Sequence, residues 1–221
     1  MTINRRKHMT TKDYKALSIR EFTKAAQVYE SSQAGIYRMC RKDYPDVLAE
    51  LEKEPFNDLL DCGCGTAPML TLLHKKYPKK HYTGIDLTPK MIEVARSKKM
   101  AGVKLVVGDC ENLPFADNSY DVVICCQSFH HYPNAQNFFD SVYRVLRPGG
   151  RLILRDMTMD SAAVRWFCNH IEMPIINLFG HGDVRVYGRD DVNRLCKKAG
   201  LKMELFEKRG FCRLHCVARK P

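Results

Sequence analysis

Short hydrophobic runs alternate with amphipathic stretches between Phe56 and about residue 154. The stretches have the three-to-four-residue spacing of helices, and the runs are the length of strands. Strands that are apolar almost throughout are typical of a parallel sheet covered on both faces, so the pattern predicts an open α/β fold of Rossmann type. The expected strands are Leu59–Cys62, Tyr82–Ile85, Val103–Val107, Asp121–Cys126 and Leu152–Leu154. The expected helices between them are Met69–Tyr77, Pro89–Lys99 and Ala135–Leu146.

The C-terminal part of the chain extends this sheet. The turn residues Arg147-Pro148-Gly149-Gly150 separate the last of these helices from the fifth strand. A helix over Arg189–Ala199 ends at Gly200, a favourable residue after a helix. Met203–Phe206 and His215–Ala218 then form an antiparallel pair, which brings the predicted sheet to seven mostly parallel strands.

Two further segments lie outside this alternation. Residues 1–54 are expected to form an N-terminal arm, disordered over residues 1–12, followed by helices over Ile19–Glu30 and Gly35–Glu54 that cap the pocket of the acceptor. Residues 158–187 are long for a connection and contain a helical stretch near Ala162–Ile171, so we expect a lid. The main domain is accordingly expected to span residues 55–221.

The charge is concentrated at the two ends of the chain. The chain carries 36 Lys and Arg against 25 Asp and Glu, a net charge of +11. Residues 1–45 hold ten basic and four acidic side chains, and residues 195–221 hold eight and two. Such charge favours an acidic substrate or weak attraction to RNA or anionic membrane, but it is not clustered like a nucleic-acid-binding arm. The favoured interpretation is a solvated surface that confers solubility.

The cysteines and the hydrophobic runs indicate a cytoplasmic protein. No apolar run approaches 18 residues, which excludes a membrane span, and the basic N-terminus lacks the apolar region of a secretory signal. The ten cysteines are then expected to be reduced. They contain no C-x-x-C spacing, so we expect no metal site and interpret them as small core residues.

The densest chemical signal is a glycine turn after the first strand, Asp61-Cys62-Gly63-Cys64-Gly65-Thr66-Ala67. Two glycines allow a tight turn and close approach of a ligand to the backbone. Pro68 stands where a dinucleotide fingerprint has its last glycine, and there is no Gly-Lys-Ser/Thr of a phosphate loop. Asp61 suits a ligand with a positively charged end. A turn used only for packing is the alternative.

Two more aspartates end the next two strands. Asp86 follows Ile85 and could accept hydrogen bonds from both hydroxyls of a ribose. Asp109 follows the strand after that and could accept one from an adenine amino group. Each alone could be a helix cap or a turn residue. Three acids at the carboxyl ends of successive strands lie where open α/β sheets bind ligands.

These motifs resemble the class I S-adenosylmethionine-dependent methyltransferases, in particular the branch that contains the ubiquinone/menaquinone-biosynthesis methyltransferases. The resemblance covers about Phe56–Leu154, although Ala67 replaces the family's usual third glycine. Further segments are characteristic of the family: Glu111-Asn112-Leu113-Pro114-Phe115, Ser119-Tyr120-Asp121 and Leu146-Arg147-Pro148-Gly149-Gly150.

The resemblance implies the cofactor S-adenosylmethionine, with its sulfonium-bearing methionine end over the Asp61 turn. It also implies that Gln127 to His131 line the face between cofactor and substrate. The cofactor-binding residues that it implies are Asp61, Gly63, Cys64, Gly65, Asp86, Leu87, Met91, Asp109, Cys110, Glu111 and Gln127. If the acceptor must lose a proton, the candidate bases are His131 and His130, unless either is a structural histidine.

The sequence after the fourth strand narrows the range of possible methyl acceptors. It reads Cys126-Gln127-Ser128-Phe129, not the Asn/Asp-Pro-Pro-Tyr pattern of enzymes that methylate the exocyclic amines of nucleobases. We therefore expect a small-molecule acceptor, with anionic character in view of the net charge. An RNA-modifying enzyme and a non-catalytic cofactor-binding module are the alternatives. Five apolar residues could line the acceptor pocket or simply pack in the core: Trp166, Phe167, Met173, Phe179 and Tyr187.

Overall fold

The computed structural model describes residues 9–31, 38, 40–210 and 212–221. Its centre is a seven-stranded sheet with the order β3-β2-β1-β4-β5-β7-β6. The first five strands in this order are parallel, and β7 pairs antiparallel with both β5 and β6. The strands are β1 (Asp58–Cys62), β2 (His81–Asp86), β3 (Val103–Val107), β4 (Tyr120–Cys126), β5 (Leu146–Met157), β6 (Lys202–Lys208) and β7 (Arg213–Arg219). The predicted fold class is confirmed.

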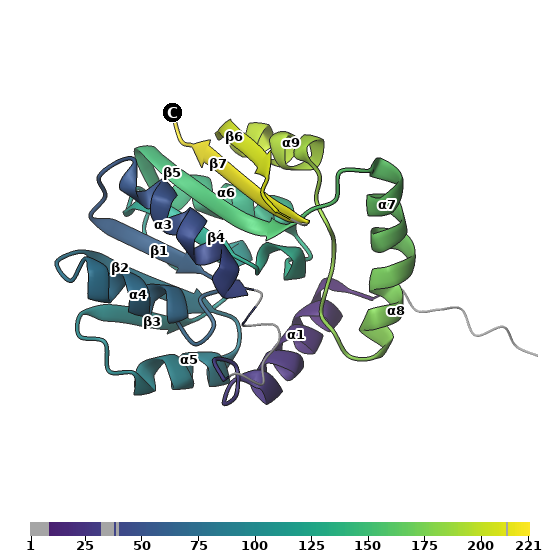
Figure 1. Ribbon diagram of the computed structural model, residues 1–221, viewed down its shortest axis with the longest axis horizontal. Coiled ribbons are helices and arrows are strands. Elements are labelled where there is room, and N and C mark those ends of the chain that lie inside the picture. The colour runs from purple at the N-terminus through teal and green to yellow at the C-terminus, as the bar shows by residue number, and fades with distance from the viewer. Residues whose placement is uncertain (1–8, 32–37, 39, 211) are drawn as a thin grey trace, which may run out of the picture.

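Helices cover both faces of this sheet (Figure 1). The α-helices are α1 (Thr11–Ala25), α3 (Tyr44–Glu52), α4 (Pro68–Lys76), α5 (Pro89–Ser97), α6 (Ala135–Val145), α7 (Ala162–Phe167), α8 (Met173–Leu178) and α9 (Arg189–Ala199). Shorter helical turns are η1 (Arg41–Asp43), η2 (Cys110–Asn112), η3 (Phe129–His131) and η4 (Cys168–Glu172).

Alternation along the strands divides the core into two layers. Leu60, Val123 and Leu152 pack with side chains of α6 and α9 on one face. Their neighbours Leu59 and Ile153 point the opposite way and pack with α3 and α4. Because a side chain must point to one face or the other, polar residues at the strand ends inherit the same alternation.

The N-terminal helix begins earlier than predicted. Thr10 caps α1 by accepting the N–H of Asp13, and the Asp13 carboxylate accepts the N–H of Thr10 in return. The expected helix over Ile19–Glu30 was therefore wrong at both ends, and Thr11 and Lys12 are helical instead of disordered. Residues 1–8 lie outside the described part.

Two other boundaries also needed correction. Of the expected helix over Gly35–Glu54, the structure forms η1 and α3, while residues 35–37 and 39 lie outside the described part. The Pro-Gly-Gly segment belongs to β5: Tyr120 pairs with Leu146 and Val122 with Arg151, so the residues between bulge out of register. Gly149 has φ +78°, which accommodates this bulge.

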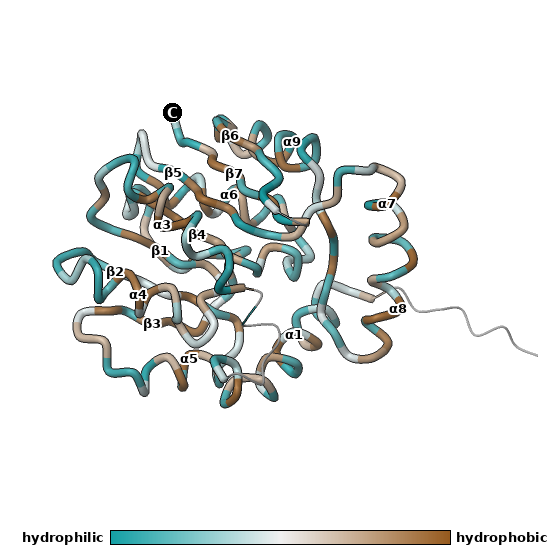
Figure 2. The backbone as a smooth tube through the Cα atoms, in the orientation of Figure 1, coloured by the Kyte–Doolittle hydropathy of each residue, from teal (hydrophilic) through white to brown (hydrophobic). Residues whose placement is uncertain are grey.

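The segment after β5 projects from the sheet as α7, η4 and α8 (Figure 1). Hydrophobic positions recur along it (Figure 2). Three of its expected pocket or core residues lie on the surface: Trp166 is 57% exposed, Phe167 53% and Phe179 81%. Only Met173 and Tyr187 are buried, so the sequence interpretation was wrong for the other three.

Candidate functional site

The glycine turn after β1 forms one wall of a cleft at the carboxyl ends of the parallel strands. Gly63 has φ +72°, and a Cβ there would lie 1.9 Å from the Ser128 hydroxyl oxygen, so no larger residue fits. Gly65 also has positive φ, at +55°. Ala67, at φ +60°, adopts the left-handed conformation before α4, which costs an alanine about 1–2 kcal/mol. The absent third glycine is therefore replaced by a strained residue without a change of turn.

The carboxylate of Asp86 is fixed by backbone donors at the end of β2. Its oxygens accept the N–H of Gly65 at 2.9 Å and that of Thr88 at 2.8 Å. Burial raises its pKa, and these two hydrogen bonds oppose the rise. Asp86 thus links the glycine turn to the loop after β2.

Asp61 is buried in the same wall, with 3% of its surface exposed. Burial and the neighbouring charge of Asp86 raise its pKa to about 8. A carboxylate that is costly to ionise alone becomes favourable beside a cation. Its chemistry therefore fits a ligand whose positively charged end enters the cleft.

Asp109 and Glu111 follow β3 and bind a residue from the far end of the sequence. Lys15 of α1 places its ammonium nitrogen 2.6 Å from Asp109 Oδ2 and 2.5 Å from Glu111 Oε2. Glu111 also accepts the backbone N–H of Asn134 at 2.6 Å. The acid that we expected at an adenine amino group therefore already holds a cation from α1.

The cleft has two parts that share Phe22, Gly63, Asp86, Ser128 and His131. Each part has a volume of about 50 Å³. Ten of the eleven expected cofactor-binding residues line one part or both: Asp61, Gly63, Cys64, Gly65, Asp86, Leu87, Met91, Asp109, Cys110 and Gln127. Glu111 does not line it, because its carboxylate faces Lys15 and Asn134.

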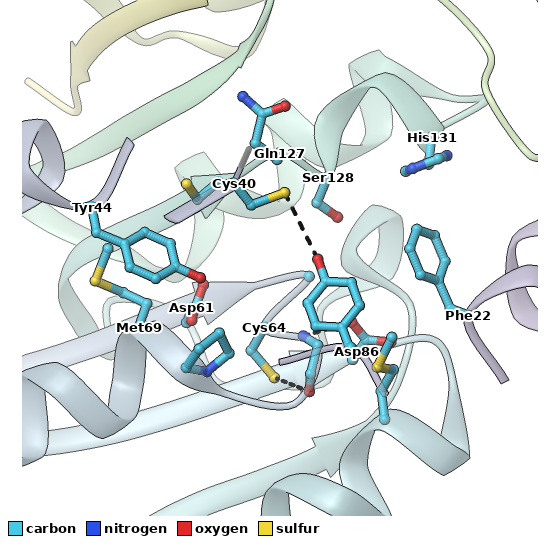
Figure 3. A pocket seen from close by; sticks show the side chains of 16 residues that line it. Phe22, Cys40, Tyr44, Asp61, Cys64, Met69, Asp86, Gln127, Ser128 and His131 are labelled. Carbon is cyan, nitrogen blue, oxygen red and sulfur yellow. Dashed lines mark hydrogen bonds between the residues drawn. The ribbon is translucent and has the colours of Figure 1, made fainter. Parts of the chain in front are cut away.

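The opposite wall of the cleft comes from the N-terminal helices that the sequence predicts as a cap, but its individual residues were not among the expected site residues. Lys15, Ser18 and Phe22 come from α1, and Tyr29 and Tyr44 come from the segments after it. The Phe22 ring meets the His131 ring edge-on, with centroids 5.1 Å apart, and Figure 3 shows both at the cleft. No local motif signals these residues, because their contacts span a hundred positions along the chain.

The two candidate bases have opposite charge states. Burial and then the charge of His130 lower the pKa of His131 to about 4, so His131 is neutral near pH 7. Burial would also lower the pKa of His130, but Asp156 outweighs it and raises this pKa to about 9. His130 Nδ1 lies 2.6 Å from Asp156 Oδ1, which makes a buried ion pair. Of these two histidines, His131 lines both parts of the cleft and His130 lines neither.

These histidines also form a cluster with Asp183 that resembles a set of metal ligands. Asp183 Oδ1 lies 3.4 Å from His130 Nε2 and 3.5 Å from His131 Nδ1, and the potential ligand atoms lie within 4.8 Å of one another. His130 is cationic and faces carboxylates on both ring nitrogens. We therefore interpret the cluster as an ion-pair network.

Comparison with known proteins identifies the central part of the chain. Residues 60–154 match the family described as "Methyltransferase domain". A phthiotriol/phenolphthiotriol dimycocerosates methyltransferase of Mycobacterium leprae is 37% identical over 109 residues, 49% of this chain and 40% of that protein. A ubiquinone/menaquinone biosynthesis C-methyltransferase of Desulfotalea psychrophila is 35% identical over 114 residues, 51% of this chain and 46% of that one.

Solved structures support the fold over most of the chain. A SAM-dependent methyltransferase from Aquifex aeolicus superimposes with a TM-score of 0.67 at 20% identity, covering 90% of this chain and 98% of that one. The coverage of the two curated relatives is lower, because the matched segments span less than half of the length of each. The correspondence to them is limited to these matched segments.

Proposed function

Because this chain contains a class I methyltransferase domain, we propose that it transfers the methyl group of S-adenosylmethionine to a small-molecule acceptor. The observation that carries the proposal is the sheet wall of the cleft. Asp61, Asp86 and Asp109 lie at the carboxyl ends of three adjacent strands and line one cleft beside the glycine turn. This is the place where open α/β sheets bind their ligands.

The residues of the sheet wall fit the cofactor chemically. Asp61 would hold its cationic methionine end, and Asp86 keeps acceptor capacity for the ribose hydroxyls after accepting two backbone N–H groups. Bound there, the cofactor supplies a methyl group already activated on a sulfonium. Asp109 would bind the adenine amino group only after Lys15 leaves. Since ligand sites measure about 300–1,000 Å³, α1 must also move before the two small parts of the cleft can hold it.

His131 is the better candidate to receive a proton from the acceptor. It is neutral, so a ring nitrogen is free of a proton at pH 7, and it lines the cleft. His130 is held in the charged state by Asp156 and positions its neighbour. Most of the rate would come from alignment of the acceptor with the methyl group, because the methyl group needs no further activation.

The segments outside the methyltransferase domain supply the covers of the site. Helix α1 forms one cover. Residues 158–187 form the other, since His181 Nδ1 lies 2.8 Å from Glu21 of α1 and Ser18 Oγ donates to the carbonyl of Gly182 at 3.5 Å. The two covers therefore contact each other. We propose residues 158–187 as the lid over the acceptor.

The small-molecule class of acceptor is supported by the two named relatives, whose acceptors are a mycobacterial lipid and a quinone precursor by name. Among the described residues, none of the helices has the length and apolar character that crossing a membrane requires. The ten cysteines are free thiols. Because free thiols are typical of a reducing compartment, we propose that the protein is cytoplasmic.

The first test is thermal unfolding with S-adenosylmethionine, S-adenosylhomocysteine and NAD. A ligand at about 100 times its Kd stabilises by about 2.7 kcal/mol, which for this chain length raises Tm by about 5–10 °C. We expect this shift with both adenosyl ligands and none with NAD. No shift with either adenosyl ligand, in folded protein free of carried-over cofactor, would overturn the proposal.

The second test separates enzyme from binding module. Wild-type protein is incubated with methyl-labelled cofactor and either small-molecule extracts or RNA. We expect label in the small-molecule fraction, and we expect His131→Gln to lower kcat while leaving S-adenosylhomocysteine affinity within about twofold. Label found only in RNA would favour the RNA-modifying alternative. If no fraction contained label, the non-catalytic alternative would be favoured.

A further inference from the structure

A second cavity opens on the opposite side of Gln127 from the cofactor cleft. Its volume is about 630 Å³, within the range of small-molecule sites. We call it the basic cavity, and its lining residues are Lys42, Asp46, Gln127, Arg155, Met157, Met159, Arg209, Gly210, Cys212 and Arg213. It lies where β5 ends and β7 begins, next to η1 and α3.

The lining of the basic cavity carries more positive than negative charge. Three guanidiniums share two carboxylates: Asp43 binds Arg155 and Arg213, and Asp46 binds Arg155 and Arg209. Glu207 also binds Arg209. The exposed Lys42 adds a fourth cation at the rim, so the four cations exceed the three carboxylates. The field inside the cavity therefore favours an anion.

Arg155 has unused hydrogen-bonding capacity inside this lining. It is 1% exposed, and only its Nη2 nitrogen contacts the two carboxylates. Its Nε and Nη1 atoms are buried, and neither has a hydrogen-bond partner among the described residues. Buried donors of a charged group that lack partners cost free energy, which an additional acceptor oxygen would recover. A carboxylate that enters the cavity supplies such oxygens.

The remaining wall is apolar and leads toward the proposed base. Met157, Met159 and Cys212 line it, and thioether side chains adapt well to irregular apolar ligands. Met157 and Gln127 also line a cavity of about 170 Å³ that reaches His131. An apolar body could thus extend from the basic cavity to the cofactor cleft.

Gln127 separates the two compartments. It lines the cofactor cleft and the basic cavity, and its side-chain amide donates to Asp43 at 2.7 Å. In Figure 3 this amide points away from the glycine turn. Its φ of +52° is unfavourable for a residue with a side chain, and such strain is often found where a ligand must be approached.

We propose that the basic cavity binds the methyl acceptor, and that this acceptor carries a carboxylate on an apolar body. This assignment rests on the proposed function. The carboxylate lies among Arg155, Arg213 and Lys42, and the apolar body lies along Met157 toward Gln127. The cavity thereby selects acceptors by one anionic group and one apolar chain.

Octanoate and octanamide, which have equal chain length but differ in charge, test this assignment by calorimetry. We expect octanoate to bind at least tenfold more tightly, and added salt to reduce the difference. Arg213→Gln should weaken octanoate about tenfold, and the exposed Lys42→Gln about threefold. Neither substitution should change octanamide binding. Lys197→Gln on the exposed side of α9 is the charge-matched control, with no expected effect.

The failures of the two proposals are distinguishable in the same samples. If S-adenosylhomocysteine stabilises every variant but octanoate binds no better than octanamide, the assignment of the cavity is wrong and the proposed function stands. The same conclusion holds if both cavity variants bind octanoate like wild type, or if S-adenosylhomocysteine displaces octanoate. If S-adenosylhomocysteine stabilises no protein, the proposed function fails, and with it the acceptor role of the cavity.

Discussion

The two walls of the proposed cofactor cleft are built in different ways. The sheet wall holds Asp61 and Asp86 on strands whose neighbours Leu60 and Ile85 are fully buried. The Asp86 carboxylate is fixed by backbone N–H donors that lie within 21 residues of it in the sequence. We expect the core beneath this wall to hold its geometry when a ligand binds.

The opposite wall, which we call the helix wall, is formed mainly by α1, and this helix buries few of its side chains. Of the residues of α1, only Ser18 is buried. The helix is held mainly by polar contacts to distant segments: Lys15 to Asp109 and Glu111, and Glu21 to His181. Ion pairs of partly exposed groups contribute about 0–1 kcal/mol each. We propose that a preformed recognition surface and a detachable cover share one cleft, and the predictions below test that division.

The largest effect is expected at Asp86 on the sheet wall. Asp86→Ala removes the acceptor for the N–H groups of Gly65 and Thr88 and for the ribose. We expect S-adenosylhomocysteine affinity to fall at least about 100-fold, measured by calorimetry, which corresponds to about 2.7 kcal/mol. Asp140→Ala on the exposed side of α6 is the matched control. An affinity within threefold of wild type would show that the sheet wall does not bind the cofactor.

Asp61 should make binding of a cationic ligand depend on pH. Its pKa is about 8 without ligand, and an ammonium beside it would lower that value. A proton must then leave on binding below pH 8, so affinity for S-adenosylhomocysteine should fall by up to about tenfold per pH unit below 8. 5′-Methylthioadenosine, which lacks the amino-acid end, should show no such dependence. Asp61→Asn should abolish the difference between the two ligands, and equal pH profiles in wild type would contradict the assignment.

The same group should oppose folding at neutral pH. Asp61 has a pKa near 4 in the unfolded chain and about 8 in the fold. Its contribution to the free energy of unfolding is therefore complete below pH 4 and is lost as the pH rises toward 8. Asp61→Asn should therefore raise Tm at pH 8 and change it little at pH 4, as followed by circular dichroism. A lower Tm at pH 8 would show that ionised Asp61 has partners in the fold.

The division between the walls also decides what could be predicted from the sequence. The sheet wall follows from local spacing: a strand, two glycines and an acid at each strand end, so ten of eleven expected residues line the cleft. Glu111 was the exception, because its partners Lys15 and Asn134 are distant in the sequence. The helix wall and the basic cavity consist of such long-range contacts, for which a single sequence carries no signal.

One boundary error was avoidable in principle. Thr10 and Asp13 have the spacing of a capping box, which predicts a helix start at Thr11. The apolar spacing around Phe22 pointed to a later start, because the first turn of α1 faces solvent and carries no hydrophobic signal. The polar residues of this turn give no apolar periodicity in the sequence, and for the same reason they bury little surface against the rest of the protein.

The smallest effect is expected at Lys15, and it has the opposite sign to that of Asp86. Lys15→Ala removes the cation from Asp109 and frees its carboxylate for the adenine amino group. Because the ion pair is partly exposed and worth about 1 kcal/mol, we expect S-adenosylhomocysteine to bind about fivefold more tightly. Lys12→Ala in the exposed first turn of α1 should leave the affinity unchanged. Weaker binding in Lys15→Ala would mean that Lys15 contacts the ligand, and that the helix wall is part of the recognition surface.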